Sequence, residues 1–373
     1  MRHQVLASFV LSFSLLGSVT SFAAYGLNPF GPEFKPQADT VIAVTNMPRV
    51  RSQDTFGICY AFVASTLIDE ANCVQNKVSD CSSVSDNDKV SPLDMSRYSQ
   101  KLSDGTDDTD RFNYEGLTEG GSESFALFNA AFRAQSITRE SCAPFDQVVG
   151  KVKDPAEAQQ LEIAMWTKFK DSYDAYKKKK EGCAQCALEF ATATANDIKQ
   201  DYGLKASNQD ILKAFSEDSY GKFLDKILIP DNCWDLKNQT TLKGAWTQNI
   251  YPEKGQKSNY ASAISKIKEV LTQKRPLSLG FCTQTPLKAK TMADCGVKSK
   301  TGKLEKGESH AIVIKGYRRV CNSANKCYDA LQIQNSWGES WQNSNDDGWV
   351  DAKELLDRSF YETQSMTWLT QQK

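Results

Sequence analysis

The sequence predicts an α+β protein whose chain folds into two lobes. Apolar residues recur at helical spacing through the first half, whereas short strand-type runs dominate the last third. The 373 residues include 40% hydrophobic and 24% charged side chains, a balance that is typical of folded domains and excludes wholesale disorder. A cleft between two such lobes is a common place for an active site.

The N-terminus has the features of a secretory signal peptide over residues 1–23. Arg2 precedes an apolar run over residues 5–19, which is too short to span a membrane comfortably, and Ala23 ends a small-residue cleavage site. A buried core helix is the alternative interpretation of this run. We therefore expect cleavage after Ala23 and a secreted or periplasmic protein without a membrane anchor, in a compartment where disulfides persist.

Residues 24–47 contain three prolines and predict an extended N-terminal arm, and residues 48–145 predict a helical lobe. Within this lobe, residues 58–71 are apolar and contain few turn formers, so we expect a buried helix that begins at or just before Cys59. A second helix is predicted over residues 122–134. Its apolar face would carry Phe125, Phe128, Ala131 and Phe132.

Residues 146–254 predict a mostly helical insertion. Asp154-Pro155 is a favourable helix start, and the lysines at 177–180 suit the C-terminal end of the same helix. The aromatic stripe at 166–176 lies between them and is expected to face a core. Two further amphipathic stretches complete the block, at about 185–202 and 208–228.

Residues 255–373 predict a β-rich lobe. One helix is expected near its start, with a buried face made by Ile264, Ile267, Val270 and Leu271. Short runs of strand type follow, at 277–282, 311–317, 328–334 and 349–351.

The charge balance and the histidine count exclude several classes of function. With 45 basic and 46 acidic residues, the chain offers no electrostatic case for binding nucleic acid or an anionic membrane. Only two histidines are present, which nearly excludes a histidine-built metal centre, so no metal and no cofactor are expected. His3 leaves with the signal peptide, and His310 is then the only histidine.

The ten cysteines other than Cys59 can all form disulfides. Proximity in the sequence suggests three pairs, Cys73–Cys81, Cys282–Cys295 and Cys321–Cys327. Cys142 and Cys233 flank the helical block and could close its base, which would leave Cys183 and Cys186 to pair. The sequence is equally compatible with other pairings among these four cysteines. A zinc site at Cys183 and Cys186 would need a second ligand pair, and a redox motif would need a surrounding βαβ pattern. The sequence offers neither.

Four residues supply the groups needed for acyl transfer through a thioester. A helix N-terminus and a neighbouring imidazolium would both favour a thiolate at Cys59, and His310 is the available imidazole. Asn335 could hold the second ring nitrogen through its amide oxygen. The side-chain NH₂ of Gln53 and the backbone N–H of Cys59 could serve a developing oxyanion. Each residue also has an ordinary structural interpretation. Cys59 could be a buried structural thiol or a disulfide partner, and His310 could be a core histidine. Asn335 could be a turn residue, and the match at Gln53 could be incidental.

The segments around these residues resemble the papain family of cysteine peptidases. The family's nucleophile segment is Gln, five residues and Cys-Trp-Ala-Phe. Its histidine segment is Asn/Asp-His-Ala before an apolar strand, and its third segment is Asn-Ser-Trp-Gly-x-x-Trp. The corresponding segments here, in the same order, are Gln53 with Cys59-Tyr60-Ala61-Phe62, Ser309-His310-Ala311, and Asn335-Ser336-Trp337-Gly338-Glu339-Ser340-Trp341. The matches cover roughly residues 48–145 and 260–350.

The resemblance implies a papain-like two-lobe fold, with a helical left lobe and an antiparallel β-barrel-like right lobe, into which the helical block is inserted. It implies that Cys59 and His310 form a thiolate–imidazolium pair, that Gln53 serves the oxyanion and that Asn335 orients His310. It also implies a substrate cleft. The residues expected to line that cleft are Gly57, Gly120, Gly121 and Trp337, the last also shielding the His310–Asn335 bond from water.

The chain departs from the family pattern at several points. Phe56 replaces a cysteine whose usual disulfide partner falls near Thr118, and both halves are missing together, which predicts that packing replaces the bond. Ile58 and Tyr60 alter the surroundings of the nucleophile. Residues 24–58 leave no room for a folded N-terminal inhibitory propeptide. The chain is therefore expected to lack one, and the helical block is the alternative regulator of access to the cleft.

Two functions follow from these observations. The first is a secreted cysteine endopeptidase that hydrolyses protein or peptide substrates, with a preference implied by the family for an apolar or aromatic side chain two residues before the scissile bond. The second is a catalytically silent papain-fold protein that binds peptides or a partner through the inserted block. A thiol transamidase on a similar triad is a third interpretation, and a proteinaceous inhibitor is a further candidate partner.

Overall fold

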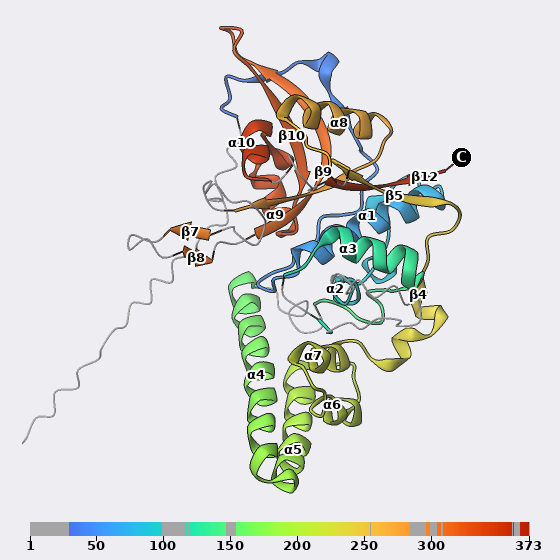
Figure 1. Cartoon of the computed structure of the whole chain (residues 1–373), viewed down its shortest axis with the longest axis vertical. Helices are drawn as coiled ribbons and strands as arrows, with labels where there is room; N and C mark the ends of the chain where they lie inside the picture. Colours follow the sequence, from blue (N-terminus) through green and yellow to red (C-terminus); the bar gives the residue numbers. More distant parts are fainter. Residues whose placement is uncertain are drawn as a thin grey trace, which may run out of the picture.

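The computed structural model describes most of the chain, from the N-terminal arm to the last strand (Figure 1). The described residues are 30–98, 116–117, 120–146, 154–253, 255–283, 296–298, 304–306, 309–359, 361 and 366–372. The predicted signal peptide with its cleavage site at Ala23 lies outside these ranges. So do residues 24–29 of the predicted arm and Cys295.

One large antiparallel sheet dominates the right lobe, as the strand-type runs predict. Its strands follow the order β11-β10-β9-β6-β12-β5, and β1 and β2 of the N-terminal arm pair with β9. The strands are β1 (Lys35–Pro36), β2 (Ile42–Ala43), β5 (Trp246–Tyr251), β6 (Leu277–Cys282), β9 (Ser309–Cys321), β10 (Cys327–Gln334), β11 (Trp349–Asp351) and β12 (Met366–Gln371). β5 falls within the range predicted as the insertion, yet it pairs with β12 along its whole length.

Helices flank this sheet. The helix α8 (Tyr260–Thr272) buries the four apolar residues expected on its inner face, and it packs near β2 and β9. Two shorter helices follow the last long strands, α9 (Gly338–Ser344) and α10 (Ala352–Asp357). Two small two-stranded sheets stand apart from the large one. They are β3 (Ile137–Thr138) with β4 (Gln239–Thr240), and β7 (Gly296–Lys298) with β8 (Leu304–Lys306).

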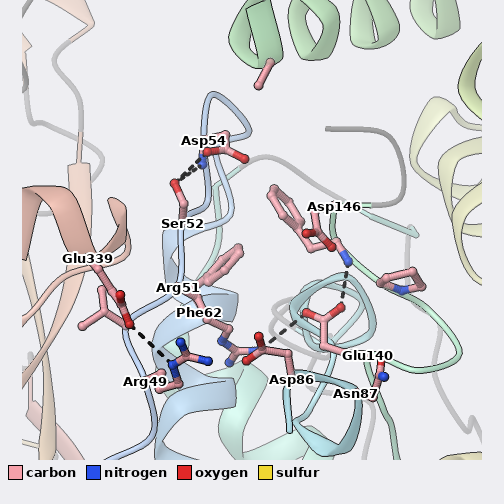
Figure 2. Close-up of a pocket in the computed structure, with 14 residues that line it drawn as sticks. Arg49, Arg51, Ser52, Asp54, Phe62, Asp86, Asn87, Glu140, Asp146 and Glu339 are labelled. Atoms are coloured by element: carbon pink, nitrogen blue, oxygen red, sulfur yellow. Dashed lines mark hydrogen bonds and ion pairs between the residues drawn. The ribbon is translucent and has the colours of Figure 1, made fainter. Parts of the chain in front are cut away.

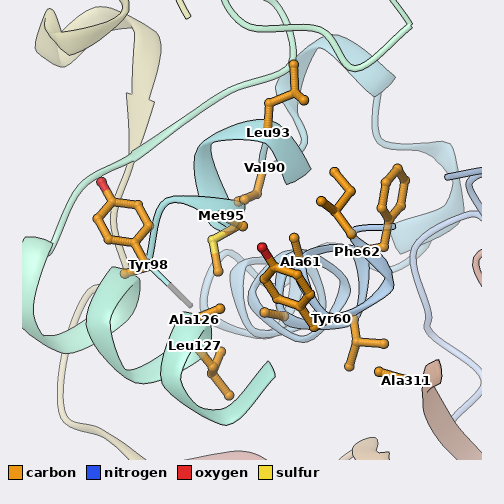
Figure 3. Packing of buried hydrophobic residues seen from close by; sticks show 14 of the residues in the cluster. Tyr60, Ala61, Phe62, Val90, Leu93, Met95, Tyr98, Ala126, Leu127 and Ala311 are labelled. Carbon is orange, nitrogen blue, oxygen red and sulfur yellow. The ribbon is translucent and has the colours of Figure 1, made fainter. Parts of the chain in front are cut away.

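The left lobe is built around α1 (Cys59–Gln75), which begins at the cysteine where the sequence predicts a helix start. Thirteen of its residues are buried, because α1 lies between the sheet and two short helices, α2 (Pro92–Ser96) and α3 (Glu123–Phe128). Figure 3 shows its side chains Tyr60 and Phe62 among apolar residues of this lobe, with Ala311 of β9 nearby. The Tyr60 hydroxyl donates to the carbonyl of Ser96 at 3.2 Å, which satisfies its buried polar atom.

The helical block extends from the left lobe as a separate layer (Figure 1). Its helices are α4 (Pro155–Gly182), α5 (Ala184–Tyr202), α6 (Asn208–Ala214) and α7 (Tyr220–Leu228). Asp154 caps α4 by accepting from the backbone N–H groups of Ala156 and Glu157, as expected for an Asp-Pro start. Most of the aromatic stripe faces the block's own core, where Phe169 and Phe223 are fully buried. Trp166 differs from the expectation, because its ring stacks on Phe56 outside the block.

The block is fastened to the left lobe at its base. A disulfide joins Cys142 to Cys233, with the two Cα atoms 5.6 Å apart. The buried guanidinium of Arg97 lies 2.9 Å from the carboxylate of Asp94 and 3.0 Å from that of Asp225 on α7. The ring of Trp234 covers the same guanidinium at 4.0 Å. Both ends of the insertion are thereby held at one place on the lobe.

The disulfides agree with the predicted pairs wherever both partners are described. Four bonds are present: Cys73–Cys81, Cys142–Cys233, Cys183–Cys186 and Cys321–Cys327. Cys282 is also disulfide-bonded, and its predicted partner Cys295 lies outside the described residues. Cys59 is the free cysteine of the described chain. Within the same ranges, no helix combines the length and the apolar character that a membrane span requires.

The Arg97 cluster provides a test of how the block is held. Replacing Arg97 with methionine would leave the buried carboxylates of Asp94 and Asp225 without their cation, so we expect the free energy of unfolding to fall by about 3–5 kcal/mol. Urea denaturation followed by circular dichroism measures this. The exposed Lys213–Asp210 pair is the matched control, because Lys213→Met should cost less than about 1 kcal/mol. Equal stability of the two variants would contradict the anchoring role of Arg97.

Candidate active site

Cys59 is the first residue of α1, so the free backbone N–H groups of the helix start lie around its sulfur. Ile58 before it and Tyr60 after it are fully buried, whereas Cys59 keeps part of its surface accessible. The backbone N–H of Ala311 donates a hydrogen bond to the sulfur. Because Ala311 directly follows His310, strand β9 brings the predicted base to the predicted nucleophile.

The His310 imidazole is held on several sides. Its Nε2 lies 2.7 Å from Oδ1 of Asn335. The Trp337 ring stacks on the imidazole with 4.5 Å between centroids and 16° between planes, and Phe281 meets it edge-on at 5.7 Å. His310 is 4% exposed. These contacts leave Nδ1 as the ring nitrogen available for exchange of a proton with the thiol.

Asn335 follows β10 and fixes the tautomer of the imidazole. Its Oδ1 also accepts from the backbone N–H of Ser336 at 2.8 Å, so this atom is an acceptor and the proton lies on Nε2 of His310. The Asn335 backbone N–H donates in turn to Oε1 of Gln342 at 3.3 Å. The asparagine is thus oriented before any substrate binds.

Gln53 belongs to the same network. Its Oε1 accepts from the Ser336 hydroxyl at 2.5 Å, and its backbone N–H donates to the Ser336 carbonyl at 2.8 Å. The side-chain Nε2 donates to the carbonyl of Phe56 at 3.2 Å. An amide NH₂ has two hydrogens, so this arrangement points the amide toward the turn before Cys59 with a second hydrogen to donate.

Gly57 and Gly120, two of the predicted cleft glycines, lie side by side close to the nucleophile. The backbone N–H of Gly120 donates to the carbonyl of Gly57 at 2.9 Å, and Gly121 follows directly. Gly120 has a φ of +76° and would have open space around an added Cβ, so its backbone angle and not crowding favours glycine. Trp337, the fourth predicted cleft residue, covers His310. The structure therefore brings all eight predicted site residues into one region.

Burial opposes the pre-formed thiolate–imidazolium pair that the resemblance implies. Burial is the main cause that raises the pKa of the Cys59 thiol to about 11, and the negative charge of Glu123 adds to the rise. Burial also lowers the pKa of His310 to about 4, although its bond to Asn335 opposes the change. Burial therefore acts against a charge on either residue before a substrate binds.

A cavity of about 430 Å³ is lined in part by residues of the segment 49–54. Figure 2 shows Arg51 in it with the carboxylate of Glu140, and these two side chains are 3.5 Å apart. Cys59, His310 and Asn335 are not among its lining residues, so this cavity is distinct from the predicted cleft. Within the described residues, no group of three or more His, Cys, Asp or Glu side chains is arranged to hold a metal ion.

Two residues near the nucleophile were not predicted from the sequence. Glu162 and Trp166 of α4 contact the turn at 53–58, through Thr55 and Phe56 respectively. The sequence assigns the aromatic stripe that includes Trp166 to the core of the block. The available signal was Phe56 itself, because a large aromatic in place of a cysteine requires a new packing partner.

These elements together form a papain-like two-lobe α+β fold, with the cysteine at the start of a buried helix and the histidine and asparagine on the facing sheet. No protein-family model matches the chain, and no curated protein does. Among solved structures, xylellain, a cysteine protease from Xylella fastidiosa, is 12% identical at a TM-score of 0.43, covering 91% of each chain.

Two further cysteine proteases are similar at comparable levels. The bromelain protease from Ananas comosus is 10% identical at a TM-score of 0.38, covering 89% of this chain and 99% of its own. Digestive procathepsin L 3 of Tenebrio molitor is 12% identical at a TM-score of 0.39, covering 92% of this chain and 73% of its own. Identities this low bear on the fold alone.

The raised pKa of Cys59 predicts how its alkylation depends on pH. A thiol whose pKa is raised stays protonated at neutral pH, so the rate of alkylation by iodoacetamide should climb about tenfold per pH unit and level off only near pH 11. Mass spectrometry of the alkylated peptide measures the rate. His310→Ala is the control and should show the same profile. A plateau already reached at pH 6–7 in the unmodified protein, lost in His310→Ala, would instead mean a pre-formed ion pair.

Proposed function

We propose that the chain is a cysteine endopeptidase that hydrolyses peptide bonds through an acyl-enzyme thioester on Cys59. The observation that carries the proposal is the position of His310 on β9, hydrogen-bonded to Asn335 and directly followed by Ala311 at the Cys59 sulfur. Asn335 accepts from Nε2 of His310 at 2.7 Å, and the adjacent Ala311 N–H bonds to the Cys59 sulfur. A nucleophile, a base and a group that orients the base are the minimum set for nucleophilic catalysis.

In the first half of the reaction, the sulfur of Cys59 attacks the carbonyl carbon of the scissile bond while its proton passes to Nδ1 of His310. The thiolate–imidazolium pair is then formed on the reaction path, since burial disfavours either charge alone. The imidazolium donates its proton to the leaving amine, and the C–N bond breaks. Water, deprotonated by His310, then hydrolyses the thioester and restores the thiol.

The tetrahedral intermediate carries a negative oxygen that needs donors. The second hydrogen of Gln53 Nε2 and the backbone N–H of Cys59 are the groups we assign to it. The hydrogen bonds of Gln53 to Ser336 and Phe56 support this assignment, because they restrict the amide to one orientation. Asn335 and Trp337 keep the imidazole in the plane that the proton transfers require.

The substrate would lie along Gly57, Gly120 and Gly121, whose backbones run beside the nucleophile. The disulfides of the described chain support work in an oxidising compartment, so we propose that the peptidase is secreted or periplasmic. The described part of the N-terminal arm pairs with Gly316–Cys321 of β9, away from His310. It therefore offers no cover for the cleft.

One observation favours a second candidate function. The burial that raises the pKa of Cys59 to about 11 would keep the thiol unreactive in a protein that only binds peptides. Such a protein would retain the cleft, and Phe56 and Ile58 would serve its packing alone. The two candidates differ in one measurable property, which is covalent reaction with an activated inhibitor.

We expect an epoxysuccinyl peptide to label Cys59 at one equivalent per chain and to abolish hydrolysis of a fluorogenic peptide library. The reason is that attack on the epoxide uses the same sulfur and the same proton from His310 as attack on a peptide. Intact-protein mass spectrometry and a fluorescence assay measure the two effects. Cys59→Ala is the control and should fold normally, take up no label and hydrolyse nothing. Absence of both labelling and hydrolysis in the unmodified protein would leave the peptide-binding candidate.

A further inference from the structure

The turn at residues 53–58 carries the groups that we assign to the oxyanion. It contains no helix or strand, and Asp54 and Thr55 at its tip are exposed. Its internal hydrogen bonds are few: the Phe56 N–H donates to the Gln53 carbonyl at 3.2 Å, and the Ile58 N–H donates to the Phe56 carbonyl at 2.7 Å. Asp54 has a φ of +47°, which costs energy for a residue other than glycine. A turn of this kind needs support from outside to keep one shape.

Glu162, in the second turn of α4, supplies part of that support. It is 2% exposed, and its two carboxylate oxygens lie 3.2 and 3.1 Å from the backbone nitrogen of Thr55, which donates to them. The same carboxylate accepts from the indole Nε1 of Trp166 at 3.0 Å. Hydrogen bonds to a charged acceptor are stronger than neutral ones, so a single buried carboxylate joins the turn to the helix.

Trp166 adds a second contact one helical turn further along. Its ring stacks on Phe56 with 4.2 Å between centroids and 17° between planes. The Phe169 ring meets the Trp166 ring edge-on, with 5.9 Å between centroids. Phe169 in turn contacts the ring of Tyr202 on α5 at 5.5 Å. The aromatic contacts therefore run from the turn before the nucleophile into the core of the helical block. Phe56 is also the residue at which the sequence predicts packing in place of a lost disulfide.

We propose that Glu162 and Trp166 are positioning residues, which hold the 53–58 turn so that Gln53 and the Cys59 N–H meet the oxygen of the bound carbonyl. The inference rests on the proposed peptidase function. It makes the helical block a part of the catalytic scaffold and not a gate over the cleft. The anchors at Cys142–Cys233 and Arg97–Asp225 fit this role, because they fix the block that carries α4.

The test compares four variants of the full chain. Glu162→Ala removes the acceptor, Glu162→Gln keeps an amide oxygen for the Thr55 N–H, and Trp166→Phe keeps a ring on Phe56 but removes the indole donor. Asp171→Ala is the matched control, since Asp171 is an exposed carboxylate on the same helix. Three quantities are measured for each: kcat and KM on a fluorogenic peptide, the rate of iodoacetamide alkylation of Cys59, and amide hydrogen exchange across residues 53–58.

We expect Glu162→Ala to lower kcat at least tenfold with KM changed less than twofold, because an oxyanion donor acts mainly in the transition state. Alkylation, which forms no oxyanion, should change less than twofold, and exchange in the turn should accelerate at least tenfold. Glu162→Gln should restore most of kcat, Trp166→Phe should be intermediate, and Asp171→Ala should match the unmodified protein. Alkylation separates loss of positioning from general damage to the site.

The outcomes separate this inference from the function on which it rests. If the unmodified protein hydrolyses peptides and Glu162→Ala matches Asp171→Ala in kcat and in exchange, the positioning role is wrong and the peptidase function stands. If Glu162→Ala loses alkylation and hydrolysis in parallel, Glu162 supports the fold and has no specific role in the turn. If the unmodified protein neither hydrolyses peptides nor takes up the epoxysuccinyl label, both proposals are wrong together.

Discussion

The contact between the start of α1 and strand β9 is the constraint on which the rest of the structure depends. The helix is buried along most of its length, so its direction is determined by the packing of both lobes around it. At its N-terminus the Ala311 backbone N–H meets the Cys59 sulfur, which joins the helix to the sheet at the reactive atom. A shift of either element would separate the thiol from the imidazole. Every other feature of the site orients groups around this meeting point.

The cost of this arrangement is electrostatic. Placing a thiol and an imidazole between two packed lobes removes water from both, which makes a charge on either residue unfavourable. The hydrogen bond from His310 to Asn335 recovers part of this loss for the imidazolium. The same low-polarity surroundings strengthen the attraction between charges that appear together, and they strengthen donors aimed at an oxyanion. A site in which burial opposes single charges can therefore still favour charge separation once a substrate carbonyl is bound.

The elements that local sequence determines could be predicted, and those that depend on distant pairings could not. The helix start at Cys59, the strand runs and the disulfides between neighbouring cysteines follow from periodicity and short separations. The bond from Thr55 to Glu162 spans 107 residues, and no pattern near either residue indicates it. The pairing of Arg97 with Asp225 spans an even longer stretch of chain. The effect of burial on the pKa of Cys59 could not be predicted for a related reason. Burial depends on the whole fold, whereas the sequence indicates only the helix N-terminus.

The Cys142–Cys233 disulfide closes a loop of chain that holds the whole helical block, and its two cysteines are 91 positions apart in the sequence. The bond therefore keeps the chain connected even where the backbone of the block is cut. A cut anywhere between α4 and α7 would yield two fragments that remain one covalent molecule, and the packing of the block would hold the cut ends near each other. In a compartment that contains proteases, a nicked chain would therefore keep its Cys59, His310 and Asn335 on connected fragments until the disulfide is reduced.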